Sequence, residues 1–101
     1  MAKKKTPETL IKNAAKELLS LYRIWTFPVL QGMGAHPGIA DRLGIYKGKP
    51  LAIEFKSPKG RMSPNQAYFR LQWELEGGLY IECRTLEDLT KALGIKTLGM
   101  I

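Results

Sequence analysis

Three charged residues, Asp41, Glu54 and Lys56, stand in segments that otherwise read as buried strands. Side chains alternate between the two faces of a strand, so in "PLAIEFK" Glu54 and Lys56 point the same way. Carboxylate oxygens are preferred ligands of Mg²⁺, Mn²⁺ and Ca²⁺, and a neighbouring lysine adds a fixed positive charge where negative charge develops. These residue types suit metal-assisted hydrolysis of a phosphodiester bond.

The hairpin register decides whether Asp41 meets Glu54. If the chain turns through Lys47-Gly48 as a two-residue loop, Tyr46 lies opposite Lys49. The same register places Asp41 opposite Glu54, with Cβ atoms about 4.5–5.5 Å apart. Two such carboxylates repel by roughly 3 kcal/mol at an effective dielectric near 20. We therefore expect a retained proton, a lysine between them or a bound metal to compensate this repulsion.

Hydrophobic periodicity and capping signals predict seven elements around these residues. Thr6-Pro7-Glu8 and the capping-box spacing of Ser63 and Gln66 mark two helix starts. The expected elements are a helix over 7–22, strands over 23–30, 39–46 and 50–56, a helix over 64–76, a strand over 79–84 and a helix over 86–94. The order is αβββαβα, which predicts an α/β fold with a mixed four-stranded sheet flanked by helices.

The composition indicates one small, basic domain. The chain has 101 residues and carries 16 Lys and Arg against 9 Asp and Glu, for a net charge of +7. We expect a basic flexible tail over 1–5 and a single domain over 6–101. This charge favours a polyanionic partner, most commonly nucleic acid.

Membrane insertion and disulfide bonding are not expected. No apolar run approaches the roughly 18 residues of a spanning helix, and no secretory signal follows "MAKKK", so an intracellular protein without a membrane partner is predicted. The single cysteine, Cys83, excludes an internal disulfide and a thiolate metal cluster, and we expect it in the core.

The arrangement of these motifs resembles the VRR-Nuc family of the PD-(D/E)xK, or restriction-endonuclease-like, nuclease superfamily. The resembling stretches are "TPETLIKNAAKELL", "FPVLQGMGAHPGIADRLGIY", "PLAIEFKSPKGRMSPNQ" and "GGLYIECRTLEDL", which cover about residues 6–93. The acidic motif reads "GIAD" and lacks the proline for which the superfamily is named.

The resemblance implies a role for each matching residue. Asp41 and Glu54 would bind Mg²⁺ or Mn²⁺, and Lys56 would be the catalytic lysine. Gln66 would reach into the site from its helix, and Glu8 would contact the metal directly or through water. The backbone carbonyl of Phe55, next to Glu54, could be a further ligand.

The implied activity is that of a divalent-metal-dependent endodeoxyribonuclease acting on branched or duplex DNA, such as a Holliday-like junction or a flap. No organic cofactor is expected. The chain is expected to form a homodimer. The candidate DNA contacts are Lys47, Lys49, Lys59, Arg61 and His36. Two alternatives stay open: a non-catalytic basic DNA-binding module, and a subunit of a DNA-processing assembly.

Several of these residues also have ordinary structural explanations. Gln66 could simply close the capping box with Ser63, and Glu8 could serve as a first-turn acid favoured by the helix dipole. Lys56 could be a surface ion-pair partner of Glu54. The aromatic residues are expected in the core or at a subunit interface rather than stacked on bases; they are Trp25, Phe27, Tyr68, Phe69 and Trp73.

Overall fold

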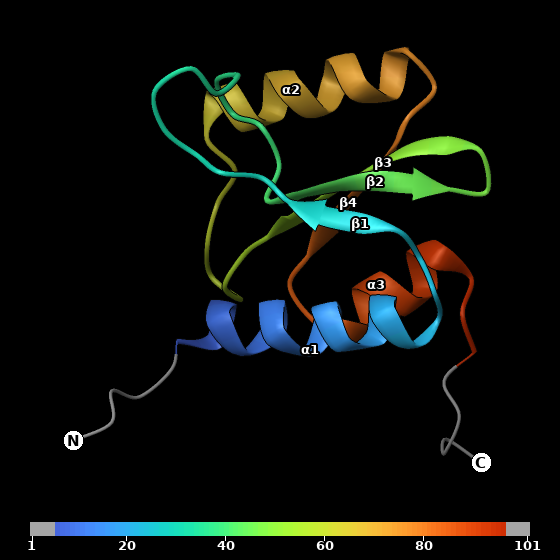
Figure 1. Cartoon of the computed structure of the whole chain (residues 1–101). Coiled ribbons are helices and arrows are strands. Elements are labelled where there is room, and N and C mark those ends of the chain that lie inside the picture. Colours follow the sequence, from blue (N-terminus) through green and yellow to red (C-terminus); the bar gives the residue numbers. More distant parts are fainter. Residues whose placement is uncertain (1–5, 97–101) are drawn as a thin grey trace.

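The computed structural model describes residues 6–96, which form a mixed four-stranded sheet and three helices (Figure 1). The elements are α1 (Pro7–Leu21), β1 (Thr26–Pro28), β2 (Arg42–Tyr46), β3 (Lys49–Phe55), α2 (Pro64–Leu75), β4 (Leu79–Cys83) and α3 (Leu86–Leu93). The strands lie side by side in the order β1-β2-β3-β4. The first three strands are antiparallel, whereas β4 pairs with β3 in parallel after the crossover through α2. The predicted element order and the mixed sheet are confirmed.

Helices cover both faces of the sheet. Figure 1 shows α1 and α3 on one face and α2 on the other. Leu51, Ile53 and Phe55 of β3 belong to the core shared with α1 and α3, which also contains the buried Cys83, as predicted. Ala52 belongs to the smaller core beneath α2. Since both faces of β3 are covered, its residues 51–55 are all buried, Glu54 among them.

The predicted hairpin register is confirmed. Tyr46 lies opposite Lys49 and Arg42 opposite Ile53, so Asp41, one residue before β2, is in line with Glu54. The turn residues Lys47 and Gly48 both have positive φ, 50° and 80°, as a two-residue hairpin with the right-handed strand twist requires.

Two predicted strands are shorter in the structure. The strand expected over 39–46 begins at Arg42, because the Asp41 side chain, rather than the ladder, bonds to β3 here. The strand expected over 23–30 comprises only Thr26–Pro28. Arg23 has a left-handed φ of 56° at the end of α1, and Pro28, which has no amide proton to donate, ends the strand. The predicted tail over 1–5 lies outside the described residues.

The loop between β1 and β2 reaches the start of α2. Gly38 has a φ of 73°, and a Cβ atom there would lie 2.2 Å from the backbone oxygen of Asn65. Only a glycine allows this close approach. The contact holds the chain just before Asp41 against the helix turn that carries Gln66. Among the described residues, no helix has the length and apolar character needed to cross a bilayer.

Candidate functional site

Glu54 is a buried carboxylate at the carboxyl end of β3. The residue is 3% exposed and lies on the face of the sheet that packs against α2. Its Oε2 atom faces Lys56, whose Nζ lies 3.6 Å away, so the two side chains share one face, as the strand alternation predicted. Its Oε1 atom is buried and has no hydrogen-bond partner within residues 6–96. An unsatisfied buried carboxylate oxygen is costly unless something positive binds it.

Gln66 performs two tasks at once. Its Oε1 accepts a 2.9 Å hydrogen bond from the backbone amide of Ser63, and Ser63 Oγ accepts one from the amide of Gln66, so the capping box is complete. Its Nε2 donates a 3.0 Å hydrogen bond to Oε2 of Glu54. The structural and the functional interpretations of this residue are therefore compatible, because one amide group serves both contacts.

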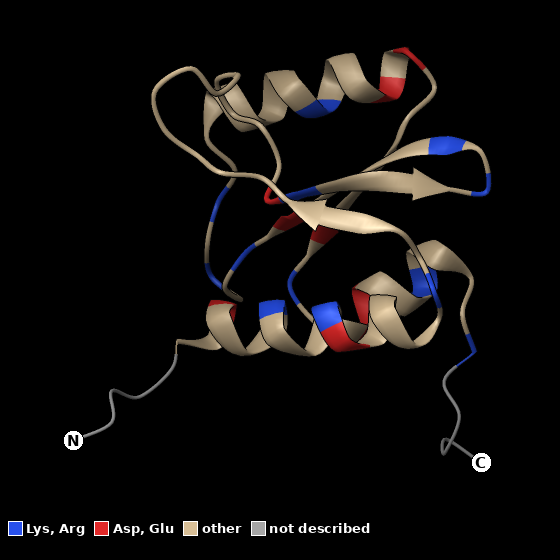
Figure 2. Cartoon of the chain, in the orientation of Figure 1, with Lys and Arg blue, Asp and Glu red and all other residues tan. Residues whose placement is uncertain are grey.

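Asp41 is anchored to the end of β3 by its side chain. Its Oδ2 accepts a 2.8 Å hydrogen bond from the backbone amide of Phe55, the residue directly after Glu54. Its backbone oxygen accepts from the amide of Val29, which follows β1. The carboxylate is thus fixed beside the peptide that links Glu54 to Phe55. Figure 2 shows several acidic positions within the sheet, between α1 on one face and α2 on the other.

Lys12 is a member of the site that was missing from the sequence prediction. Its Nζ lies 3.8 Å from Oδ1 of Asp41 and 3.7 Å from Oε2 of Glu8, one helical turn earlier. Glu8 therefore connects to Asp41 through this lysine, and its own side chain is 41% exposed. The spacing of Glu8 and Lys12 on α1 was a visible signal, but it indicated only a helical ion pair.

The pKa of Glu54 is raised from 4.5 to about 7. Burial is the largest cause, followed by repulsion from Asp41, while Lys56 opposes the rise and Glu8 adds to it slightly. No lysine of the described residues pairs with both carboxylates, as a lysine between them would; instead Lys12 pairs with Asp41 and Lys56 with Glu54. The raised pKa means that Glu54 holds its proton more tightly than an ordinary glutamate.

The donor set suits a hard divalent cation. The described residues contain no group of three or more histidine, cysteine or acidic side chains that could hold a metal by themselves. Mg²⁺, however, commonly takes one or two carboxylates and completes its shell with water and substrate phosphate. The unpartnered Oε1 of Glu54 and the Asp41 carboxylate beside the Phe55 peptide fit that pattern.

The five predicted DNA contacts do not form one surface. Lys47 and Lys49 lie at the β2–β3 turn, at the opposite end of β3 from Glu54 and about 17 Å away at 3.4 Å per residue. Lys59 and Arg61 are exposed in the segment that leads from β3 to α2, at the Glu54 end. His36 donates from Nδ1 to the backbone oxygen of Pro37, and its ring packs edge-on against Phe69 at 5.7 Å.

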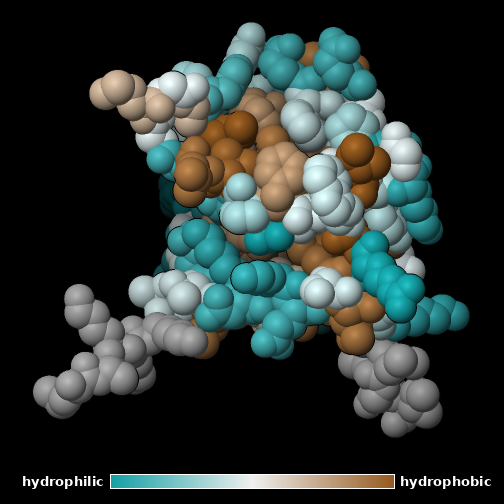
Figure 3. All heavy atoms as spheres, viewed as in Figure 1, coloured by the Kyte–Doolittle hydropathy of each residue, from teal (hydrophilic) through white to brown (hydrophobic). Residues whose placement is uncertain are grey.

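The aromatic residues divide into two groups. Phe69 and Trp73 stack at 5.3 Å and pack in the core beneath α2, as expected. Trp25, Phe27 and Tyr68 are 63%, 42% and 59% exposed, so these three do not lie in the core. The other predicted position, a subunit interface, stays a prediction. Hydrophilic residues cover α1, whereas hydrophobic ones reach the surface over the β1 side of the sheet (Figure 3).

The chain has no match among known protein families, curated proteins or solved structures.

Proposed function

We propose that this protein is a divalent-metal-dependent nuclease that hydrolyses DNA phosphodiester bonds. The observation that carries the proposal is the buried Glu54 carboxylate, which has one unpartnered oxygen and lies in line with Asp41 and beside Lys56. The net charge of +7 supports a polyanionic substrate. The αβββαβα order supports a restriction-endonuclease-like fold as part of this proposal.

Asp41 and Glu54 would hold Mg²⁺ or Mn²⁺, with the Phe55 carbonyl as a further oxygen donor. The metal would supply an activated water and a counter-charge for the phosphate oxygens. Lys56 Nζ places a positive charge 3.6 Å from Glu54, where it would stabilise negative charge developing on the substrate. Gln66 holds the Glu54 carboxylate by its 3.0 Å hydrogen bond and so orients it.

A panel of DNA substrates tests this proposal. Purified protein should cut at least one of four DNA forms, namely a junction, a flap, a duplex and a single strand, when Mg²⁺ or Mn²⁺ is added. EDTA should stop the reaction. The preferred form would also identify the structure that the enzyme recognises, which we propose to be branched or duplex DNA.

Two lysine variants test whether any cleavage depends on the proposed site. Lys56→Ala should lose cutting, whereas Lys91→Ala, which removes the same charge from an exposed position on α3, should retain it. Failure of every substrate with both metals, from a protein shown to be folded, would favour the non-catalytic DNA-binding alternative. The homodimer expected from the sequence stays a prediction, which sedimentation equilibrium would check.

A further inference from the structure

A basic groove runs between α1 and the β1 edge of the sheet and ends at Asp41. It consists of two hollows, of about 290 Å³ and 370 Å³, that share Lys16 and Arg42 as lining residues. The first hollow also includes Lys12 and Asp41, and the second continues to Trp25. Of the described residues that line either hollow, Asp41 is the only acid.

Among the described cations that line the groove, only Lys12 forms ion pairs, with Glu8 and Asp41. Among residues 6–96, Lys16 and Arg42 form no ion pair. Lys12 and Lys16 stand four residues apart on α1, a like-charge spacing that weakens a helix by a few tenths of a kcal/mol. Such a concentration of positive charge indicates that the groove receives an anion from outside the chain.

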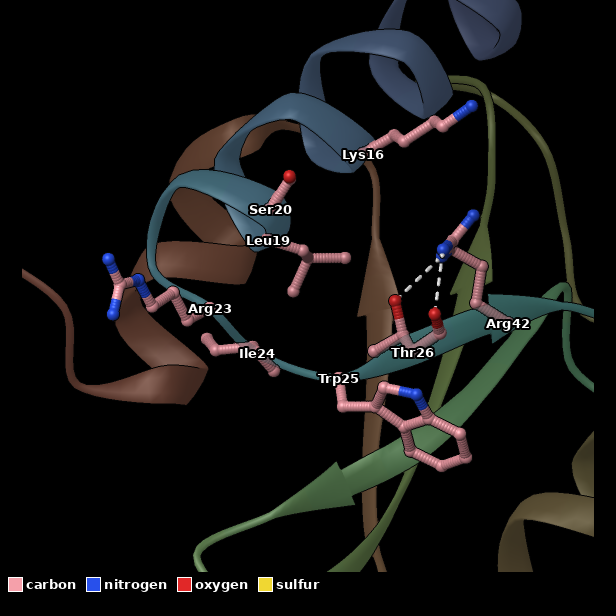
Figure 4. A pocket seen from close by; sticks show the side chains of 8 residues that line it. All are labelled: Lys16, Leu19, Ser20, Arg23, Ile24, Trp25, Thr26 and Arg42. Carbon is pink, nitrogen blue, oxygen red and sulfur yellow. Dashed lines mark hydrogen bonds between the residues drawn. The ribbon is translucent and has the colours of Figure 1, made fainter.

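Arg42 is held in place for such a contact. Its Nε donates to Thr26 Oγ1 at 3.0 Å and its Nη2 to Thr26 O at 3.3 Å, so the guanidinium is oriented without a carboxylate. Figure 4 shows Lys16 extending from α1 and Arg42 from β2 on either side of the hollow. An oriented guanidinium with free N–H groups is well suited to phosphate.

Trp25 supplies a flat apolar surface at the β1 edge, beside the far end of the groove. The residue lines the second hollow, and its ring points across β1, away from Lys16 and Arg42 (Figure 4). It is 63% exposed, and the Phe27 ring centroid is 5.3 Å away. Basic side chains that follow a backbone, combined with an exposed aromatic ring on which a base can stack, are typical of single-stranded nucleic acid sites. A paired duplex keeps its bases stacked and could not use this ring.

We propose that a single-stranded DNA segment lies in the groove and crosses the β1 edge of the sheet, with phosphates on Lys16 and Arg42 and a base stacked on Trp25. The inference rests on the proposed nuclease function, since the groove leads to Asp41 and would deliver the strand to the metal site. The substrate would then be DNA with an unpaired arm, such as a flap.

Binding in EDTA separates this inference from cleavage. Fluorescence anisotropy of a labelled oligothymidylate of about ten nucleotides, a length within the usual range for such sites, would measure affinity at several salt concentrations. Lys16→Gln and Arg42→Gln should each reduce the slope of log affinity against log salt by about 0.7, the value of one lost phosphate contact. Lys91→Gln, an equal charge change on α3, should leave the slope unchanged.

Trp25 variants test the stacking contact. Trp25→Ala should lower affinity about tenfold, and Trp25→Phe should restore part of the loss. Neither should change affinity for a blunt duplex. Circular dichroism would show whether each variant is folded. If Arg42→Gln does not fold, Lys16→Gln still tests the groove, because Lys16 is exposed.

Three results would overturn the inference. The first is a salt-dependence slope for Lys16→Gln equal to that of Lys91→Gln. The second is an equal loss of affinity for duplex and for single-stranded DNA in Trp25→Ala. The third is a Trp25→Ala variant that changes its sedimentation mass but keeps its affinity for the single strand. Because no metal is present, single-strand binding in a protein that cuts nothing would refute only the nuclease proposal.

Discussion

Gln66 Nε2 donates a 3.0 Å hydrogen bond to Oε2 of Glu54, while Gln66 Oε1 accepts a 2.9 Å bond from the Ser63 amide. The start of α2 is thereby connected directly to the buried carboxylate of β3. A residue that begins a helix also orients the acid that we propose to bind metal.

Two substitutions separate the tasks of Gln66. Gln66→Glu keeps an oxygen that can accept from Ser63, so the helix cap should survive, but it places a second carboxylate against Glu54 and should abolish cutting. Gln66→Ala loses the side-chain bonds to Ser63 and Glu54 and should lower stability by about 1 kcal/mol. Urea unfolding and a cleavage assay measure the two effects. Normal cutting by Gln66→Glu would show that this residue only caps the helix.

Glu54 should make the metal-free protein less stable as pH rises. Its pKa is about 7 in the folded chain and 4.5 ordinarily, so between these values the folded state binds more protons than the unfolded state. The free energy of unfolding therefore falls from about pH 4.5 to pH 7 and then levels off.

Glu54→Gln resembles the protonated acid and should remove this dependence. In EDTA the free energy of unfolding of the variant should be closer to that of the wild type at pH 5 and should exceed it by about 1–3 kcal/mol at pH 8. Urea unfolding at both pH values measures the gap, with Glu76→Gln at the end of α2 as the control. A gap that is the same at both pH values would contradict a raised pKa at Glu54.

Lys12 should compete with the metal for Asp41. Its Nζ lies 3.8 Å from Asp41 Oδ1, so a cation bound there must overcome the lysine's charge. Lys12→Gln should bind Mn²⁺ several-fold more tightly, because a partly exposed pair of this kind is worth up to about 1 kcal/mol. Titration calorimetry in low salt measures the dissociation constant for Mn²⁺. Unchanged affinity in this variant would place the metal away from Asp41, and weaker binding would contradict competition between the lysine and the metal.

Gly38→Ala should disturb the site from a distance. A Cβ atom there would overlap the Asn65 backbone and displace the first turn of α2, which carries Gln66. We expect the free energy of unfolding to fall by about 2 kcal/mol or more and DNA cleavage to be slower. Gly34→Ala is the matched control, since its φ of 89° is also left-handed but no atom lies within 4 Å of the added carbon. Equal losses in both variants would show that only backbone strain matters.

The sequence predicted much of the site because strand geometry is local. Alternation along β3 placed Glu54 and Lys56 on one face, and the Lys47-Gly48 turn determined the hairpin register. Lys12 could not be found this way, because the rotation of α1 against the sheet depends on packing between distant segments. The exposure of Trp25, which directly precedes β1, was missed for another reason: an aromatic residue beside a short strand is as consistent with a core as with a sheet edge.

The most direct test of the metal site compares two glutamates on neighbouring strands. Glu82 of β4 lies beside Glu54 in the parallel register, but its oxygens are paired with Arg84 at 2.7 Å and Arg70 at 3.4 Å. We would measure the Mn²⁺-dependent cutting rate of Glu54→Gln and Glu82→Gln on the substrate that the wild type prefers. Glu54→Gln should lose at least about 100-fold, the scale of removing a catalytic electrostatic group, while folded Glu82→Gln keeps most of the activity. Wild-type cutting by Glu54→Gln, or equal losses in both folded variants, would contradict a metal site at Glu54.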